Sequence, residues 1–90
     1  MLPLLPAPRP HRASAAQLRA VYTVMRILAE DDRARGADHE AYCDACRRGR
    51  AAAGSVDYAG TRLCNGCATD YEVLRMDDRV PDVGAYLGRG

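Results

Sequence analysis

Two short stretches decide the fold, Cys43-Asp-Ala-Cys46 and Cys64-Asn-Gly-Cys67, and seventeen residues separate them. Two cysteines with two residues between them can bend around one metal ion and present both thiolates to it. Two such pairs complete the tetrahedral sulfur shell that zinc prefers. The sequence therefore predicts one structural zinc ion, and its ligands are Cys43, Cys46, Cys64 and Cys67.

Other uses of the same thiols were weighed against zinc. An iron–sulfur or rubredoxin-like iron site takes the same ligands, and the sequence leaves it open. A thioredoxin-like redox motif would need a βαβ unit, and two disulfides would need an oxidising compartment; the sequence indicates neither. His39 could replace a cysteine ligand but is expected at the surface. A shell of four protein ligands leaves no position for a reacting water, which argues against metal catalysis.

The composition explains why the fold needs a metal. The chain has 90 residues, no Phe, no Trp and one Ile, so its hydrophobic core is small. At this size the burial of apolar groups barely outweighs chain entropy, and a staple is usual. A structural zinc contributes on the order of 10 kcal/mol to folding at neutral pH. We therefore expect the metal-free chain to be largely unfolded.

The charge is small and unevenly distributed. Residues 1–50 carry nine Arg against six acids, and residues 51–90 carry four Arg against six acids, for a net charge of +1. This is not the strongly basic chain of a protein that grips nucleic acid along its whole length. No stretch approaches the roughly 20 apolar residues of a membrane span, and the proline-broken start is unlike a secretory signal. We expect an intracellular protein, in the cytoplasm or, in a eukaryote, the nucleus.

The chain divides into four segments. They are a flexible proline-rich arm, an amphipathic helix, a zinc module and a C-terminal tail, at residues 1–13, 14–36, 37–78 and 79–90. Within the module we expect a loop, a short hairpin and a second helix, at residues 47–54, 55–63 and 64–76. Pro81 excludes an extension of the second helix. Three apolar residues of the tail can fold back onto the module: Val83, Tyr86 and Leu87.

The first predicted helix has a wide apolar arc. Ser14 and Gln17 have the spacing of a capping box, and Gly36 is a helix stop. Apolar side chains recur at helical spacing and extend beyond one stripe, so one small module does not cover them all. The arc is therefore a candidate interface with a second copy of the chain or with a partner protein. Its residues are Leu18, Val21, Tyr22, Val24, Met25, Ile27 and Leu28.

Around the cysteines the sequence resembles the GATA-type zinc finger, a treble clef with C-x2-C-x17-C-x2-C spacing. Leu63-Cys64-Asn65-Gly66-Cys67 is similar to the family's Leu-Cys-Asn-Ala-Cys, Gly60 falls where the family turns its hairpin, and Tyr71 matches an aromatic residue on the helix. The resemblance covers residues 43–76. It implies a small α+β fold stabilised by zinc, in which an N-terminal α-helix precedes a knuckle, a short β-hairpin and a C-terminal helix.

The DNA-reading part of that family is largely missing here. The family's Trp-Arg-Arg falls on Gly54, Ser55 and Val56, and its basic residue on the helix is replaced by Glu72. Of the base-contacting positions only Asn65 is retained, and its amide can either read adenine or cap the helix start. Acidic side chains on this helix repel phosphate. The resemblance therefore supports the fold more than DNA recognition.

Two functions remain after these exclusions. We expect a small non-catalytic adaptor that binds a protein partner or forms a homodimer, with a link to transcription by analogy with zinc modules. The alternative is an accessory factor that binds DNA or RNA through a basic loop with no aromatic residue beside it. Its candidate contacts are Arg47, Arg48, Arg50, Arg62 and Asn65. The chain has two histidines and no Gly-rich phosphate loop, so neither an enzyme nor a small-molecule substrate is expected.

Overall fold

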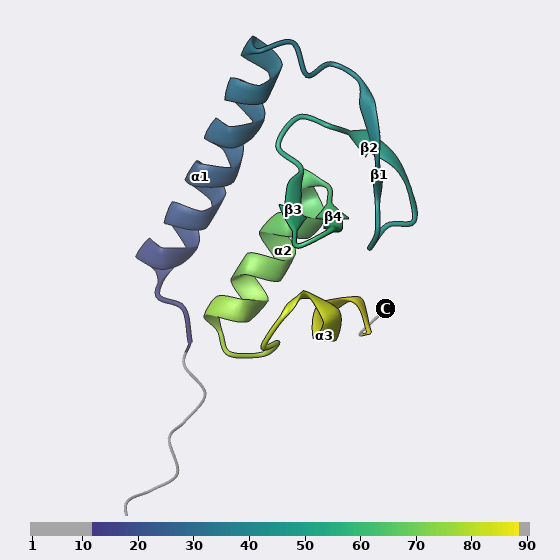
Figure 1. Ribbon diagram of the computed structural model, residues 1–90. Coiled ribbons are helices and arrows are strands. Elements are labelled where there is room, and N and C mark those ends of the chain that lie inside the picture. Colours follow the sequence, from purple (N-terminus) through teal and green to yellow (C-terminus); the bar gives the residue numbers. More distant parts are fainter. Residues whose placement is uncertain (1–11, 89–90) are drawn as a thin grey trace, which may run out of the picture.

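The computed structural model describes residues 12–88 of the chain, and the predicted arm at residues 1–13 lies outside them except for its last two residues. The described chain is a small α+β fold with an N-terminal helix and two separate two-stranded hairpins (Figure 1). Among the described residues no helix is both long enough and apolar enough to cross a membrane. The elements in order are α1 (Ala15–Ala34), β1 (Glu40–Cys43), β2 (Arg48–Ala51), β3 (Val56–Tyr58), β4 (Thr61–Leu63), α2 (Asn65–Met76) and α3 (Val83–Leu87).

Helix α1 begins and ends as its sequence predicts. The Ser14 hydroxyl accepts a hydrogen bond from the Gln17 N–H, and the Gln17 side chain accepts one from the Ser14 N–H. This reciprocal pair is the predicted capping box. The helix stops where Gly36 takes a φ of +93°, a conformation that a residue without Cβ adopts freely.

The first hairpin corrects the sequence prediction for residues 47–54. This segment was predicted to be a loop, but Arg48–Ala51 forms strand β2 and pairs antiparallel with β1. Arg47 adopts a φ of +59°, and its N–H donates to the Cys43 carbonyl at 2.7 Å, so the chain turns back along β1. The strand contains no β-branched or aromatic residue, which is why its composition gave no strand signal.

The second hairpin, β3–β4, confirms the predicted turn. Val56 pairs with Leu63, and Tyr58 pairs with Thr61. The turn between them uses two residues with positive φ, of which Gly60 has +99° and donates its N–H to the Asp57 carboxylate at 2.7 Å. The hairpin places Leu63 wholly inside the core, one residue before the second cysteine pair.

A compact core joins α1, α2 and the second hairpin. Its buried members come from α1, β4, α2 and the segment that follows α2: Met25, Leu63, Ala68, Tyr71 and Val80. The Tyr71 ring makes an edge contact with Tyr58, at 5.0 Å between ring centroids, and lies 5.6 Å from Tyr86. Tyrosine rings thus supply the aromatic packing in a chain without Phe or Trp.

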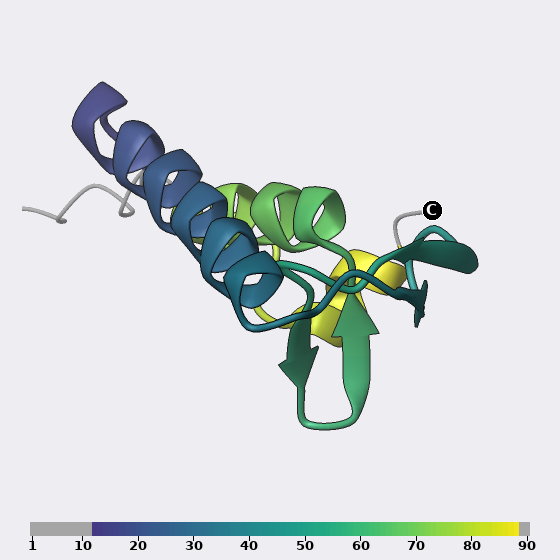
Figure 2. The same ribbon diagram turned by 90° about the horizontal axis from the view of Figure 1, so that it is seen from above.

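The C-terminal segment closes this core from one side. As predicted, Val83, Tyr86 and Leu87 pack against the core residues, and they do so from the short helix α3. The Asp82 side chain caps that helix by accepting the Ala85 N–H at 2.8 Å. Viewed from above, α1 crosses over one side of the molecule with α2 beside it, and α3 lies below α2 (Figure 2). The first hairpin projects away from α1 and carries the first cysteine pair.

Candidate metal centre

The four cysteine sulfurs converge on one point between the first hairpin and the start of α2. All four Sγ atoms lie within 4.8 Å of one another. Cys46 is 3.7 Å from Cys64 and 3.2 Å from Cys67, measured between sulfurs. A tetrahedral zinc site with Zn–S bonds of about 2.3 Å places its sulfurs roughly 3.8 Å apart. The four cysteines therefore form a cluster that could hold one metal ion, whereas His39 is exposed and is not part of it.

Backbone hydrogen bonds position both cysteine pairs. The N–H groups of Cys46 and Cys64 both donate to the Cys43 sulfur, each at 3.3 Å. The Asp44 N–H donates to the Arg62 carbonyl, and the Arg62 N–H donates to the Asp44 carboxylate, both at 2.8 Å. These bonds tie the turn of the first pair to strand β4, which leads directly into Cys64. The site is thus held at its final geometry by groups that are not themselves ligands.

The thiols perturb one another strongly. Burial raises the pKa of Cys43, but the N–H groups of Cys46, Cys64 and Ala45 stabilise its thiolate and lower the pKa from 9.0 to about 6. Burial raises the pKa of Cys67, and the neighbouring sulfurs raise it further. Four sulfurs this close cannot all ionise without a compensating positive charge. A divalent cation at their centre would supply that charge and turn all four into thiolate ligands.

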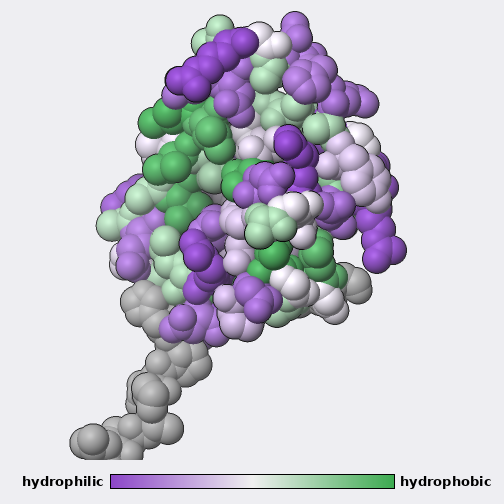
Figure 3. All heavy atoms as spheres, viewed as in Figure 1, coloured by the Kyte–Doolittle hydropathy of each residue, from purple (hydrophilic) through white to green (hydrophobic). Residues whose placement is uncertain are grey.

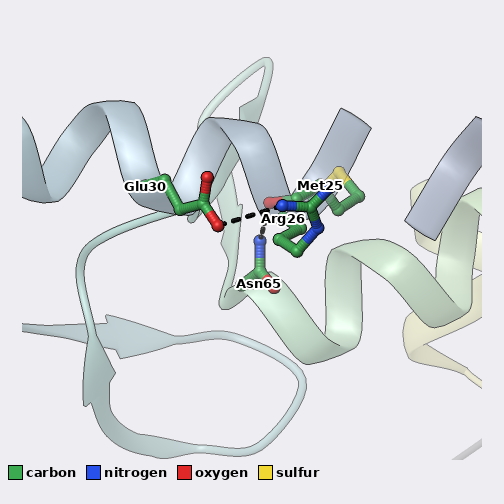
Figure 4. Close-up of polar contacts among 4 residues, drawn as sticks. All are labelled: Met25, Arg26, Glu30 and Asn65. Carbon is green, nitrogen blue, oxygen red and sulfur yellow. Dashed lines mark hydrogen bonds and ion pairs between the residues drawn. The ribbon is translucent and has the colours of Figure 1, made fainter. Parts of the chain in front are cut away.

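Asn65 has a structural role that neither sequence interpretation gave it. Its amide nitrogen donates to the Met25 carbonyl of α1 at 3.0 Å (Figure 4). It also donates to the Gly54 carbonyl at 3.1 Å. The helix cap is Cys64 instead, and it makes no side-chain cap bond. Because both amide hydrogens are engaged inside the fold, the bidentate adenine contact that was one of the two alternatives for this residue is not available. Asn65 joins α1 to the cysteine-bearing helix.

Asp32 forms the other half of this junction. Its carboxylate accepts the Gly54 N–H at 2.8 Å, so Gly54 is held by α1 on one side and by Asn65 on the other. The preceding Ala52 and Ala53 are buried although they lie in a segment predicted to be an exposed loop. A run of three alanines has no alternation of apolar and polar residues from which this burial could be predicted.

The predicted basic contacts lie on or near the first hairpin. Arg47, Arg48 and Arg50 are exposed, and within the described part of the chain none of them forms an ion pair. Arg62 on β4 is also exposed and donates to the Ser55 hydroxyl at 3.1 Å. Exposed Tyr42 pairs across the hairpin with Gly49, so an aromatic ring lies on the same hairpin as Arg48 and Arg50 but on the opposite face.

The predicted interface residues of α1 fall into three groups. Met25 is buried in the core, so it is not an exposed interface residue. Leu18, Val21 and Leu28 are half-buried. The remaining three are exposed by about half or more, with values of 57% for Tyr22, 61% for Val24 and 45% for Ile27. Figure 3 shows apolar residues gathered along α1 on this face of the molecule.

An apolar groove lies beside these exposed residues. It has a volume of about 400 Å³ and runs between α1, β3 and α2. Its lining includes Val24 of α1, Val56 and Tyr58 of β3, and Met76 of α2. Glu72 is the one charged residue in the lining, and it already accepts hydrogen bonds from Tyr58 and Arg75. All the residues that line the groove, except Glu72, are therefore uncharged.

No known protein family, no curated protein and no solved structure matches this chain. The resemblance to the GATA-type finger thus depends on the residues around the cysteines alone. The fold and the site together define a class broader than that family: a small α+β protein with a four-cysteine cluster suited to a metal ion.

Proposed function

We propose that the protein is a non-catalytic, zinc-stabilised module that binds another protein through the groove between α1, β3 and α2. Zinc is favoured because an all-thiolate set with two C-x2-C pairs is the usual donor set of a structural zinc site. Thiolate ligation needs a reducing compartment, which is where this proposal places the protein. Metal analysis of the purified protein tests the choice of metal. One zinc per chain is the expected result, and iron with strong visible absorbance would contradict it.

The order of elements supports a treble-clef arrangement. The first cysteine pair lies at the turn of the β1–β2 hairpin, the β3–β4 hairpin follows, and the second pair lies at the start of α2. This is the order of knuckle, hairpin and helix implied by the GATA-type resemblance. All four ligand positions would be filled by protein sulfurs, which leaves none for a reacting water. We therefore assign the metal a role in folding and not in catalysis.

The groove is the observation that carries the protein-binding proposal. An apolar groove lined by exposed Ala20 and Val24 is costly to leave in water and is typical of an interaction site. Its volume of about 400 Å³ has room for a few apolar side chains. The partner that fits is a short apolar segment, such as one face of an amphipathic helix laid beside α1.

A selection from a random peptide library tests this proposal directly. Peptides selected on the zinc-loaded protein should contain apolar anchors at helical spacing. Val56→Asp should weaken their binding by roughly tenfold or more, since it places a charge in the groove. Arg50→Ala, a change on the exposed first hairpin, is the matched control and should leave binding unchanged. Selected peptides that bind Val56→Asp as well as the unaltered protein would refute the groove as the binding site.

Binding of single-stranded nucleic acid is the second candidate, and one observation favours it. Tyr42 exposes its ring opposite Gly49, on a hairpin that also carries Arg48 and Arg50 on its other face. An aromatic platform with arginines nearby suits a stacked base and its phosphates. Fluorescence anisotropy with single-stranded and duplex DNA over a salt series tests it. Binding with a steep salt dependence, weakened in affinity by Tyr42→Ala, would support this candidate, and no binding at low salt would reject it.

A further inference from the structure

Helix α1 carries an apolar ridge that faces solvent, made of Ala20, Val24 and Ile27. These residues have i, i+4, i+7 spacing, so they lie on one face of the helix. All three are exposed, and no hydrogen bond or ion pair involves their side chains. Ala20 and Val24 also line the groove, so the ridge is continuous with the proposed binding site.

A row of polar side chains runs beside this ridge, and its charges are not symmetrical. Arg19, Thr23, Arg26 and Glu30 follow one another at the same helical spacing and are all exposed. The positive charge lies toward the start of α1 and the negative charge toward its end. In a parallel two-fold pair this row would face the opposite flank of the other helix, so its charges would not meet the same row. Two antiparallel copies place the two rows side by side, with Arg19 against Glu30 twice and Arg26 against Thr23 twice, which is attractive.

The ridge is self-complementary in the same antiparallel arrangement. A two-fold axis near Val24 places Ile27, its largest side chain, over Ala20 of the second copy, its smallest. Each copy then presents the same patch to the other, as an isologous dimer requires. The charged row and the ridge give nearly the same register. Pairing residue 19 with 30 places the two-fold axis between residues 24 and 25, and pairing residue 20 with 27 places it between residues 23 and 24.

We propose that a second copy of this chain occupies the α1 ridge, with the two α1 helices antiparallel. The proposal depends on the proposed function, since it names the partner of that same surface. Glu30 is available for the contact, because its ion pair with Arg26 at 3.1 Å is exposed on both sides and such pairs contribute little. A second copy lying on Val24 also covers the open side of the groove.

The size of the surface sets the strength to be expected. A 20-residue helix presents a face of roughly 30 Å by 10 Å, or about 300 Å². A standard stable interface takes about 800 Å² from each partner, so α1 alone falls well short of it. With the groove wall added, the dimer belongs among weak complexes, with a dissociation constant in the micromolar range.

Sedimentation equilibrium of the zinc-loaded protein, from about 2 to about 300 µM, measures this association. The expected result is a monomer–dimer equilibrium that Ile27→Glu weakens about tenfold or more. Arg19→Glu and Glu30→Arg should each weaken it several-fold, and the double variant should restore it because the pair is re-formed with reversed charges. Arg35→Glu, the same charge change at the C-cap beyond the row, is the matched control. Circular dichroism and zinc content establish that each variant is folded.

Three outcomes would overturn the proposal. A chain that stays monomeric over the whole range forms no such dimer, and a dimer that Ile27→Glu leaves intact uses another surface. A double charge reversal that binds more weakly than either single one refutes the antiparallel register. Failure of the dimer is distinguishable from failure of the groove, because Val56→Asp weakens the selected peptides only if the groove is the binding site.

Discussion

Gly54, which has no side chain, is hydrogen-bonded on one side to Asp32 of α1 and on the other to Asn65 of α2. Its φ is +78°, and a Cβ built there would lie 2.4 Å from the Asn65 amide nitrogen and 2.9 Å from the Ala29 Cβ. Gly54→Ala should therefore combine backbone strain with a steric clash, at a cost of about 2 to 4 kcal/mol in the free energy of unfolding. Urea denaturation of the zinc-loaded protein measures it.

Gly60 provides the control for this prediction. Its φ of +99° is as unfavourable for alanine, but nothing lies within 4 Å of a Cβ at this position. Gly60→Ala should therefore lose only the backbone contribution, about 1 kcal/mol. Equal losses for the two variants would mean that the junction between α1, Gly54 and Asn65 is not packed as described.

A second prediction at the residue scale concerns the side-chain amide of Asn65. Asn65→Asp keeps the shape of the side chain but turns a donor toward the Met25 and Gly54 carbonyls into an acceptor. We expect a loss of about 2 to 3 kcal/mol, more than for Asn65→Ala, because a half-buried carboxylate would face two oxygens. The same urea titrations decide the order. If Asn65→Asp were the more stable variant, the amide would not be the group that joins α1 to α2.

At the scale of the elements, the β3–β4 hairpin is tied to α2 by a tyrosine hydroxyl. The Tyr58 hydroxyl donates to the Glu72 carboxylate at 2.9 Å. Burial raises the pKa of Tyr58 above its ordinary value of 10.0, and the hydrogen bond and charge of Glu72 raise it further. Since the folded pKa lies above the unfolded one, this contribution to stability is complete below about pH 10 and is lost as the pH rises through the folded pKa.

Tyr58→Phe should therefore change both the stability and its dependence on pH. Near pH 8 it removes one hydrogen bond, at a cost of about 1 kcal/mol. As the pH rises above about 10, the variant should lose less stability than the unaltered protein, because it has one fewer phenol whose pKa is raised by folding. Tyr42→Phe, a change on an exposed ring, is the control near pH 8. Identical slopes in the alkaline range would show that Tyr58 ionises equally easily in the folded and unfolded states.

The elements that the sequence predicted are those with local chemical signals. Ser14 and Gln17 indicate the start of α1, and Ala59-Gly60 indicates the turn of the second hairpin. Caps and turns can be predicted in this way because they depend on residues that are neighbours in the sequence. Strand β2 has no such signal, since it is held by pairing with β1 and by the turn at Arg47. Likewise, the cysteine spacing predicted the cluster, whereas the role of Asn65 depends on α1, forty residues earlier.

At the scale of the whole molecule, the cysteine cluster lies between parts that have few other contacts. The first hairpin touches the rest of the described chain mainly through strand β4 and the cysteines, whereas α1 and α2 share the hydrophobic core. That core has five buried members, and one of them is an alanine. A core of this size does not hold 90 residues folded by itself, so the metal is expected to supply most of the stability.

Removal of the metal should therefore unfold the protein and not merely loosen the cluster. A structural zinc contributes on the order of 10 kcal/mol to folding, and a core of five buried residues supplies little in its place. Chelation should abolish most of the helical circular dichroism, and one equivalent of Zn²⁺ should restore it. Cys46→Ser should weaken zinc binding and lower the melting temperature, whereas His39→Ala, outside the cluster, should change neither. If the chelated protein kept its helical signal, α1 and α2 would be stable through their shared core, and the cluster would be an accessory to the fold.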